Sequence, residues 1–170
     1  MTRVDETVAY IGLGSNLDDP ELQVRSAAKA LAQLPGSRLL RLSRLFRTPP
    51  WGRAEQPAFV NAVAELATRL SPRDLLDALL ALERERGRHR DGTRWGPRVI
   101  DLDILLYGDV SLDEDGLRIP HPHIAERAFV LLPLADLDAD LDVPGLGRVR
   151  ELLGRVDVQG CVPLSETGTP

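Results

Sequence analysis

Residues 99–107 constrain the fold of this chain more than any other segment, because apolar and β-branched side chains there alternate with two aspartates. The pattern predicts a strand that ends at Gly108. Side chains of a strand alternate between its faces, so Asp101 and Asp103 are predicted to lie on one face, about 7 Å apart. The opposite face, which is predicted to pack into a core, consists of Ile100, Leu102, Ile104 and Leu106.

Two carboxylates on one face of an apolar strand repel each other and are costly to remove from water. A divalent cation removes this conflict, and Mg²⁺ suits oxygen ligands that leave positions for water and phosphates. Guanidinium groups, which match phosphate oxygens, are concentrated just upstream. They belong to Arg84, Arg86, Arg88, Arg90, Arg94 and Arg98. The combination favours a site for a metal-bound polyphosphate; the alternative is an edge strand with two solvated aspartates beside an ordinary basic loop.

Hydrophobic periodicity and turn residues predict the other elements of the chain. The predicted strands are residues 8–13, 37–47 and 59–70, and the predicted helices are residues 18–34, 71–86, 124–135 and 148–153. Gly12 and Gly14 are interpreted as part of a tight turn in which a glycine packs against a neighbouring element. They do not complete a dinucleotide-binding fingerprint, because position 17 is Leu.

The helix at residues 71–86 is expected to bury Leu76, Leu79 and Leu80, and Glu83 falls on the same side. A carboxylate at such a position either pairs with an arginine or reaches a functional site. Residues 87–98 show no periodicity and contain three glycines, so we interpret them as a long loop and a candidate lid.

A second group of candidate residues precedes that helix. Residues 48–57 form a proline-rich, stiff loop that carries Trp51. In the strand that follows, Phe59 and Asn61 lie on the same face. The Asn61 amide either satisfies a neighbouring loop or hydrogen-bonds a planar ligand beside Phe59. His121 and His123 could form a metal pair, but with no third ligand nearby a structural or phosphate-contacting role is favoured.

Composition limits the class of protein. The 170 residues are 43% hydrophobic and 28% charged, as in one soluble globular domain, which we place at residues 1–164 with a disordered tail at 165–170. The net charge of −5 argues against a general nucleic-acid binder. Cys161 is the single cysteine, and no apolar run reaches membrane-spanning length or resembles a signal peptide. We therefore expect a cytoplasmic protein without nucleic-acid or membrane partners. We also expect it to be a monomer, although composition does not determine the oligomeric state.

Phosphates would have to be held without a Walker loop, since no G-x-x-x-x-G-K-[ST] motif occurs, and kinase-type motifs are also missing. Magnesium on the aspartates, together with arginine side chains, would neutralise the phosphates. Phosphoryl-type transfer depends mainly on positioning and charge stabilisation, so such a site needs no obvious nucleophile.

In several motifs the sequence resembles the 6-hydroxymethyl-7,8-dihydropterin pyrophosphokinase family of the folate pathway. The matching blocks occur in the same order and cover residues 8 to about 135. They are Tyr10-Ile-Gly-Leu-Gly-Ser-Asn-Leu17, Phe46-Arg-Thr-Pro-Pro50, Gln56-Pro-x-Phe-Val-Asn61, Gly87-Arg88, Arg94-Trp-Gly-Pro-Arg98, Asp101-Leu-Asp-Ile104, Pro120-His121 and Arg127-x-Phe129.

The resemblance implies an α+β fold: a single-domain α/β/α sandwich with a ferredoxin-like core and a mostly antiparallel sheet. It also implies that the pterin hydroxymethyl oxygen attacks the β-phosphorus of ATP and that AMP leaves. Asp101 and Asp103 would bind two Mg²⁺ ions, and Arg88 and Arg98 would be catalytic on mobile loops. The residues implied to bind ATP are Glu83, Arg90, Arg94, Trp95, Ile104, His121 and Arg127. Those implied to bind the pterin are Thr48, Pro49, Pro50, Trp51, Phe59, Asn61, Trp95 and Phe129.

Individual ATP contacts depart from the family pattern at Leu80, Asp91 and Pro122, and Phe59 stands where some members have Tyr.

Two other functions fit parts of the sequence. A phosphohydrolase with Asp101 as nucleophile would need the strand to end soon after Asp103, but the strand continues through Leu105 and Leu106. A nucleotide- or RNA-binding ferredoxin-like module would need exposed aromatics among basic residues, and the chain has only three Phe and two Tyr.

Overall fold

Strand β1 (Thr7–Ser15) forms the centre of the sheet in the computed structural model, which describes residues 5–17, 19–49, 58–86 and 99–164. On its two sides it pairs antiparallel with β4 (Phe59–Thr68) and with β5 (Asp101–Tyr107). The far side of β4 pairs with β2 (Ser37–Leu42) and β3 (Phe46–Thr48), and β10 (Val162–Pro163) pairs with β3. Within the described residues the strand order is β10-β3-β4-β1-β5.

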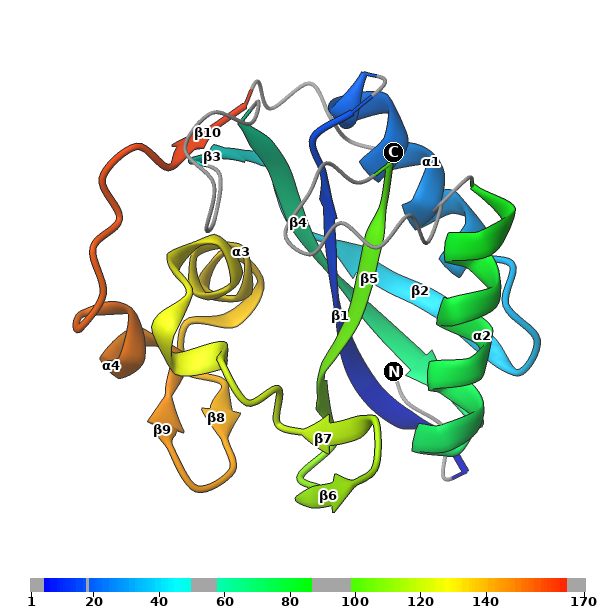
Figure 1. Cartoon of the computed structure of the whole chain (residues 1–170). Coiled ribbons are helices and arrows are strands. Elements are labelled where there is room, and N and C mark those ends of the chain that lie inside the picture. The colour runs from blue at the N-terminus through cyan, green and yellow to red at the C-terminus, as the bar shows by residue number, and fades with distance from the viewer. Residues whose placement is uncertain (1–4, 18, 50–57, 87–98, 165–170) are drawn as a thin grey trace.

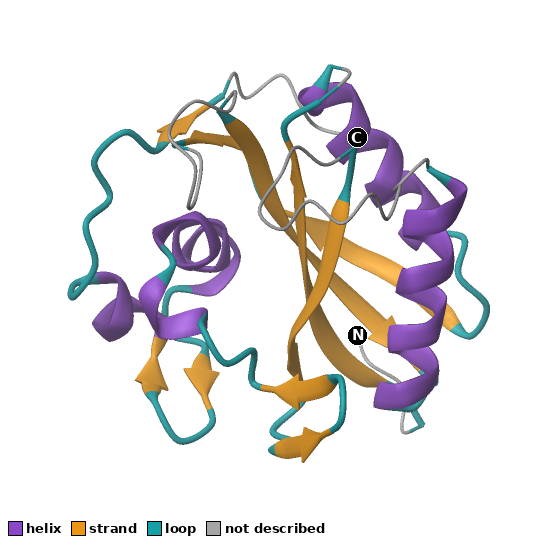
Figure 2. Ribbon diagram, viewed as in Figure 1, coloured by secondary structure: helices purple, strands orange, loops and turns teal. Residues whose placement is uncertain are grey.

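Helices cover both faces of this sheet (Figures 1 and 2). On one side lie α1 (Pro20–Leu31) and α2 (Pro72–Glu85), and on the other lie α3 (Ala128–Asp138) and α4 (Val149–Leu153). The described strand pairs are all antiparallel, and the main strands follow the order of a ferredoxin-like sheet. The predicted α+β sandwich is therefore confirmed. Residues 165–170, predicted to be a disordered tail, lie outside the described residues.

Local sequence explains where α1 and α2 begin. Each has Pro in its first turn, and the side chains of Asp19 and Ser71 accept backbone N–H groups at the N-termini. In α2 the buried residues are Leu75, Leu79 and Glu83. The prediction that Leu80 belongs to the buried side is wrong: Leu80 is only half-buried. Leu79 and Glu83 are buried as predicted and Leu76 packs against the first core, but the third buried residue is Leu75.

Two apolar cores separate the sheet from its helices. Leu102 and Ile104 pack with Leu79 and the apolar side of α1 in the first core. The second core joins Val63 and Leu105 to α3 and α4. The alternation predicted for residues 59–66 is confirmed, because the even-numbered residues face the first core and Val63 faces the second.

The segment 37–47 was predicted as one strand, and this is wrong. It is divided into β2 and β3 by Ser43, which is buried. The Ser43 hydroxyl accepts the Val63 N–H at 2.9 Å and donates to the Arg44 carbonyl at 2.8 Å. The Val63 N–H is thus donated to a side-chain oxygen, whereas in a regular antiparallel ladder it would be donated to a backbone carbonyl. The pairing with β4 is therefore interrupted at Ser43.

The turn predicted at residues 12–16 is also wrong, because β1 continues to Ser15. Gly12 lies opposite Val63 on one side and Asp103 on the other; Gly14 lies opposite Asn61 and Asp101. Pairing on both edges outweighs the low strand propensity of glycine.

Short elements complete the chain. After β5, β6 (Leu112–Glu114) forms a hairpin with β7 (Leu117–Ile119). A second hairpin joins β8 (Asp142–Val143) to β9 (Gly147–Arg148), and a 3₁₀ turn at Ile124–Glu126 precedes α3. None of the helices in the described parts of the chain is long and apolar enough to span a membrane.

Candidate active site

The two aspartates at the start of β5 lie on the sheet face opposite the first core. Asp101 is partly exposed and Asp103 is exposed, whereas the intervening Leu102 is 3% exposed. Asp101 and Asp103 lie opposite Gly14 and Gly12 of β1, which contribute no side chains to this face. The predicted placement of both carboxylates on one accessible face is therefore confirmed. No cluster of three His, Cys, Asp or Glu side chains is found within the described ranges.

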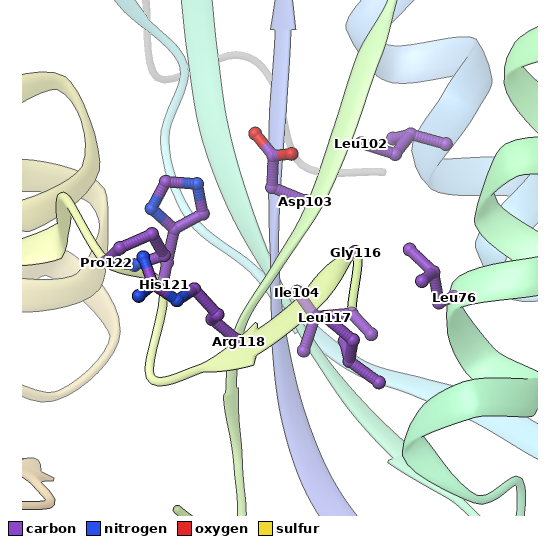
Figure 3. Close-up of a pocket in the computed structure, with 9 residues that line it drawn as sticks. All are labelled: Leu76, Leu102, Asp103, Ile104, Gly116, Leu117, Arg118, His121 and Pro122. Atoms are coloured by element: carbon purple, nitrogen blue, oxygen red, sulfur yellow. The ribbon is translucent and has the colours of Figure 1, made fainter. Parts of the chain in front are cut away.

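A cavity of about 220 Å³ lies beside Asp103, at the outer edge of β5 (Figure 3). Figure 3 shows Asp103 and His121 on one side of β5 and Leu102 and Leu76 on the other. The cavity is lined by Leu76, Leu102, Asp103, Ile104, Gly116, Leu117, Arg118, His121 and Pro122. It therefore brings together Asp103 and two residues predicted to bind ATP, Ile104 and His121.

The hairpin β6–β7 supplies lining residues that the sequence analysis missed, namely Gly116, Leu117 and Arg118. The alternation of Leu117, Arg118 and Ile119 is a weak strand signal, with the two apolar residues buried and Arg118 exposed. Arg118 forms an ion pair with Asp113 across the hairpin at 3.1 Å.

His121 is held by its own loop. Its backbone N–H donates to the Leu105 carbonyl at 3.0 Å, and its Nδ1 accepts the His123 N–H at 3.1 Å. An Nδ1 that accepts carries no proton, so the neutral ring has its proton on Nε2. Burial, with help from the Arg127 and His123 charges, lowers the pKa of His121 to about 4. At neutral pH the ring is therefore an uncharged hydrogen-bond donor at Nε2 beside the cavity. The ring centres of His121 and His123 are 5.9 Å apart, and His123 contacts His121 Nδ1 through its backbone N–H.

The lowered pKa of His121 predicts a pH dependence of stability. The folded state disfavours the charged ring, so the unfolded chain binds more protons between pH 6.5 and pH 4, and stability falls as pH falls through this window. His121→Asn keeps an acceptor for the His123 N–H and removes the titration. We expect the variant to lose less stability than the wild type between pH 7 and pH 4.5, by about 2 kcal/mol. Urea denaturation at both pH values measures the difference, and equal losses in the two proteins would contradict the assignment.

Arg127 and Phe129 enter the site from the N-terminal end of α3. The Arg127 guanidinium lies 5.3 Å from the centre of the Phe129 ring. Burial lowers the pKa of Arg127, while the carboxylates of Asp103, Glu126 and Asp101 act in the opposite direction. The cation thus shares the electrostatic environment of both β5 aspartates. Phe129 is half-buried and packs against the second core.

Glu83 contacts β5 from helix α2. Its side chain is buried, with 3% of the residue exposed, and Oε2 accepts the Leu102 N–H at 2.8 Å. That N–H belongs to the residue between the two aspartates, on the edge of β5 turned away from β1. This contact ties Glu83 to the backbone between the two aspartates, and both interpretations of Glu83, an arginine pair or a site contact, stay open.

Across the sheet, Thr48, Phe59 and Asn61 form a second group. Thr48 lies opposite Phe59 on β3 and β4, and its hydroxyl donates to Asn61 Oδ1 at 2.6 Å. Thr48 and Asn61 are 1% and 8% exposed, and Phe59 is half-buried beside them. Both interpretations of Asn61 remain compatible with the structure. Its amide oxygen accepts the Thr48 hydroxyl, and its amide nitrogen does not take part in that hydrogen bond. Pro49 is exposed next to this group.

The remaining predicted site residues lie outside the described residues, and so do the candidate lid at 87–98 and the departure at Asp91. They are Pro50, Trp51, Arg88, Arg90, Arg94, Trp95 and Arg98.

Several known proteins are similar to this chain. Residues 10–139 match the family model described as 7,8-dihydro-6-hydroxymethylpterin-pyrophosphokinase (HPPK). The chain is 52% identical over 151 residues to the 2-amino-4-hydroxy-6-hydroxymethyldihydropteridine pyrophosphokinase of Pseudomonas aeruginosa, covering 89% of this chain and 93% of that protein. It is 45% identical over 145 residues to the protein of the same name from Haemophilus influenzae, covering 85% and 90%.

Solved structures share the fold. A crystal structure of wild-type Plasmodium falciparum HPPK-DHPS with pteroate superposes with a TM-score of 0.70 at 14% identity. The match covers 88% of this chain and 42% of that chain, so this chain corresponds to less than half of the Plasmodium protein.

Proposed function

Because this chain belongs to the 6-hydroxymethyl-7,8-dihydropterin pyrophosphokinase family, we propose that the site on β5, β4 and α3 carries out the reaction of that family. The enzyme transfers diphosphate from ATP to the hydroxymethyl group of 6-hydroxymethyl-7,8-dihydropterin, releasing AMP, in folate biosynthesis. The observation that carries the assignment to this site is the cross-strand row Asn61, Gly14, Asp101, in which a candidate pterin-binding amide and a candidate metal-binding carboxylate share one sheet face.

The residues present fit magnesium. Asp101 and Asp103 project to the same accessible face, and Mg²⁺ is commonly held by one or two carboxylates together with substrate phosphates and water. Two ions on this pair would neutralise the phosphate oxygens and polarise the β-phosphorus. Glu83 supports the pair through the Leu102 backbone, which fixes the strand between the two carboxylates.

ATP would lie with its phosphates at the aspartates and its nucleoside toward the cavity beside Asp103. His121 supplies a neutral N–H donor there, and Ile104 supplies an apolar surface. Arg127 already experiences the aspartate charges and would stabilise charge that develops on the phosphates. Arg88 and Arg98 are proposed to steady the transferring group, with Glu83, Arg90, Arg94 and Trp95 completing the ATP site.

The pterin would stack between Phe59 and Phe129, and Asn61 would bind its amide edge. Thr48, Pro49, Pro50, Trp51 and Trp95 would complete this half of the site. The ring would lie with its hydroxymethyl group toward Asp101, which is separated from Asn61 by the single strand β1. Attack by that hydroxyl oxygen on the β-phosphorus forms the new P–O bond and breaks the bond to AMP.

We also propose that the enzyme acts as a cytoplasmic monomer and that residues 1–164 form its catalytic domain.

One coupled assay tests the proposal. AMP should form with MgATP only when 6-hydroxymethyl-7,8-dihydropterin is present, at one AMP per pterin diphosphate. Orthophosphate or AMP release that is independent of the pterin would instead support a phosphohydrolase. Removal of Mg²⁺ by EDTA should stop turnover, and restoring Mg²⁺ should recover it.

A further inference from the structure

Gly14 occupies the position between the two halves of the proposed site. It lies directly opposite Asn61 on β4 and directly opposite Asp101 on β5. Side chains of directly opposed residues in antiparallel strands project to the same face, so the three positions form one row. The centre of that row has no side chain.

The Asn61 amide lies over this gap. A Cβ atom added at Gly14 would be 2.7 Å from Asn61 Nδ2, and the next contacts are Asn61 Cγ at 3.8 Å and Phe59 Cδ1 at 4.0 Å. A contact of 2.7 Å is far inside ordinary van der Waals distance, whereas the ring of Phe59 would not be disturbed. The lack of a side chain at residue 14 is therefore what permits the observed position of the amide.

The other end of the amide is also fixed. Thr48 donates its hydroxyl to Asn61 Oδ1 at 2.6 Å, from a side chain that is almost completely buried. With Oδ1 turned toward Thr48, Nδ2 is turned over Gly14, in the direction of Asp101. The donor N–H groups of Asn61 thus face the part of the sheet where acceptor and phosphate would meet.

We propose that Gly14 is a positioning residue for the transfer reaction, which acts by leaving room for the Asn61 amide that Thr48 orients. This inference rests on the proposed function, because it concerns the orientation of the bound pterin relative to the diphosphate of ATP. A methyl group at position 14 forces Nδ2 away from β1 or breaks the bond to Thr48, and either change displaces the donor that would hold the pterin.

Gly12 provides a matched control in the same strand. It lies on the same face two residues away, but the three atoms nearest to an added Cβ would be side-chain carbons of Leu105, at 3.4 to 3.5 Å. Gly12→Ala therefore adds the same methyl group, with the same backbone effect, in ordinary contact with a neighbour.

The test compares Gly14→Ala with Gly12→Ala by calorimetry and steady-state kinetics. Gly14→Ala should weaken binding of 6-hydroxymethyl-7,8-dihydropterin at least tenfold and lower kcat. It should leave binding of a non-hydrolysable MgATP analogue within twofold, and Gly12→Ala should leave both ligands within twofold. Pterin binding by Gly14→Ala equal to that of the wild type would overturn the proposal, as would an equal loss for the ATP analogue.

A double-variant cycle shows whether Gly14 acts through Asn61. In an Asn61→Ala background, Gly14→Ala should cause less than a twofold further loss of pterin binding, because the displaced group is already gone. Losses that multiply would mean that the methyl group acts directly on the ligand, and would overturn the positioning role.

Should Gly14→Ala fail to fold, Thr48→Val tests the same mechanism by removing the hydroxyl that orients the amide. It should weaken pterin binding several-fold and spare the ATP analogue, and unchanged pterin binding would overturn the proposal. A wild type that neither binds the pterin nor forms AMP would refute the proposed function itself, and a normal wild type with a normal Gly14→Ala variant would refute only the positioning role.

Discussion

Asp101→Asn and Asp103→Asn should each lower kcat at least about a thousandfold, because a neutral amide is a poor magnesium ligand and several kcal/mol of charge stabilisation are lost with it. The exchange keeps the shape of the side chain, so packing on β5 is preserved. The neighbouring Leu102 and Ile104 remain in the first core, and Glu83 still accepts the Leu102 N–H.

Stability should separate this effect from a folding defect. Removing one of two like charges on the same strand face relieves repulsion but also removes an attraction to Arg127, so each variant should still unfold cooperatively, at a denaturant concentration close to that of the wild type. Asp109→Asn is the matched control: Asp109 is exposed just beyond the other end of β5 and should leave kcat unchanged. Near-normal turnover of either site variant at ordinary Mg²⁺ would exclude the metal assignment.

The parts of the fold that followed from the sequence are those governed by local pattern. Alternation over residues 100–104 placed Asp101 and Asp103 opposite the first core, as the period of a strand requires. The prediction fails at Leu106, which packs in the second core because the pairing of β1 with β5 shifts its register there. Serine and proline predicted the start of α2 for a similarly local reason. In these segments each residue's neighbours along the chain already determine which face it occupies.

The errors arose where distant partners decide the structure. Gly12 and Gly14 favour a turn by propensity, but they lie in a strand because β4 and β5 pair with both edges. Ser43 interrupts a strand through a bond to Val63, twenty residues away in the sequence. Leu75 rather than Leu80 is buried because the sheet determines which side of α2 is covered, and the apolar pattern alone permits either phase.

In the candidate site, too, some features follow from local sequence and others from contacts between distant segments. Asn61, Asp101 and His121 come from three segments, and only the pairing of strands and the loop after β7 bring them to one face. The family resemblance supplied these residues together, whereas the residues alone left Asn61 and Glu83 with two interpretations each. The cavity wall formed by β7 was missed because a three-residue strand carries almost no pattern of its own.

Asn61 should determine affinity for the pterin without affecting ATP. Its amide is held by Thr48 on one side, and its nitrogen is directed along the row toward Asp101. Asn61→Ala removes the donor and leaves the polar edge of the bound ring unpaired, which costs roughly 1–3 kcal/mol, or about 5- to 150-fold in the dissociation constant. Calorimetry with 6-hydroxymethyl-7,8-dihydropterin measures this loss directly.

Asn61→Asp tests specifically whether the amide nitrogen of Asn61 binds the pterin. The carboxylate has the shape of the amide and can still accept the Thr48 hydroxyl, but it presents an oxygen where the amide presents Nδ2. If the N–H groups of Asn61 bind the pterin, Asn61→Asp should lose at least as much pterin affinity as Asn61→Ala; a carboxylate at this buried position also costs stability, so affinity is measured under conditions in which the variant is folded. Both variants should bind a non-hydrolysable MgATP analogue within twofold of the wild type, since the cavity beside Asp103 lies at the far edge of β5. An equal loss of ATP affinity, or pterin affinity retained by Asn61→Asp, would show that the amide nitrogen does not bind the ring.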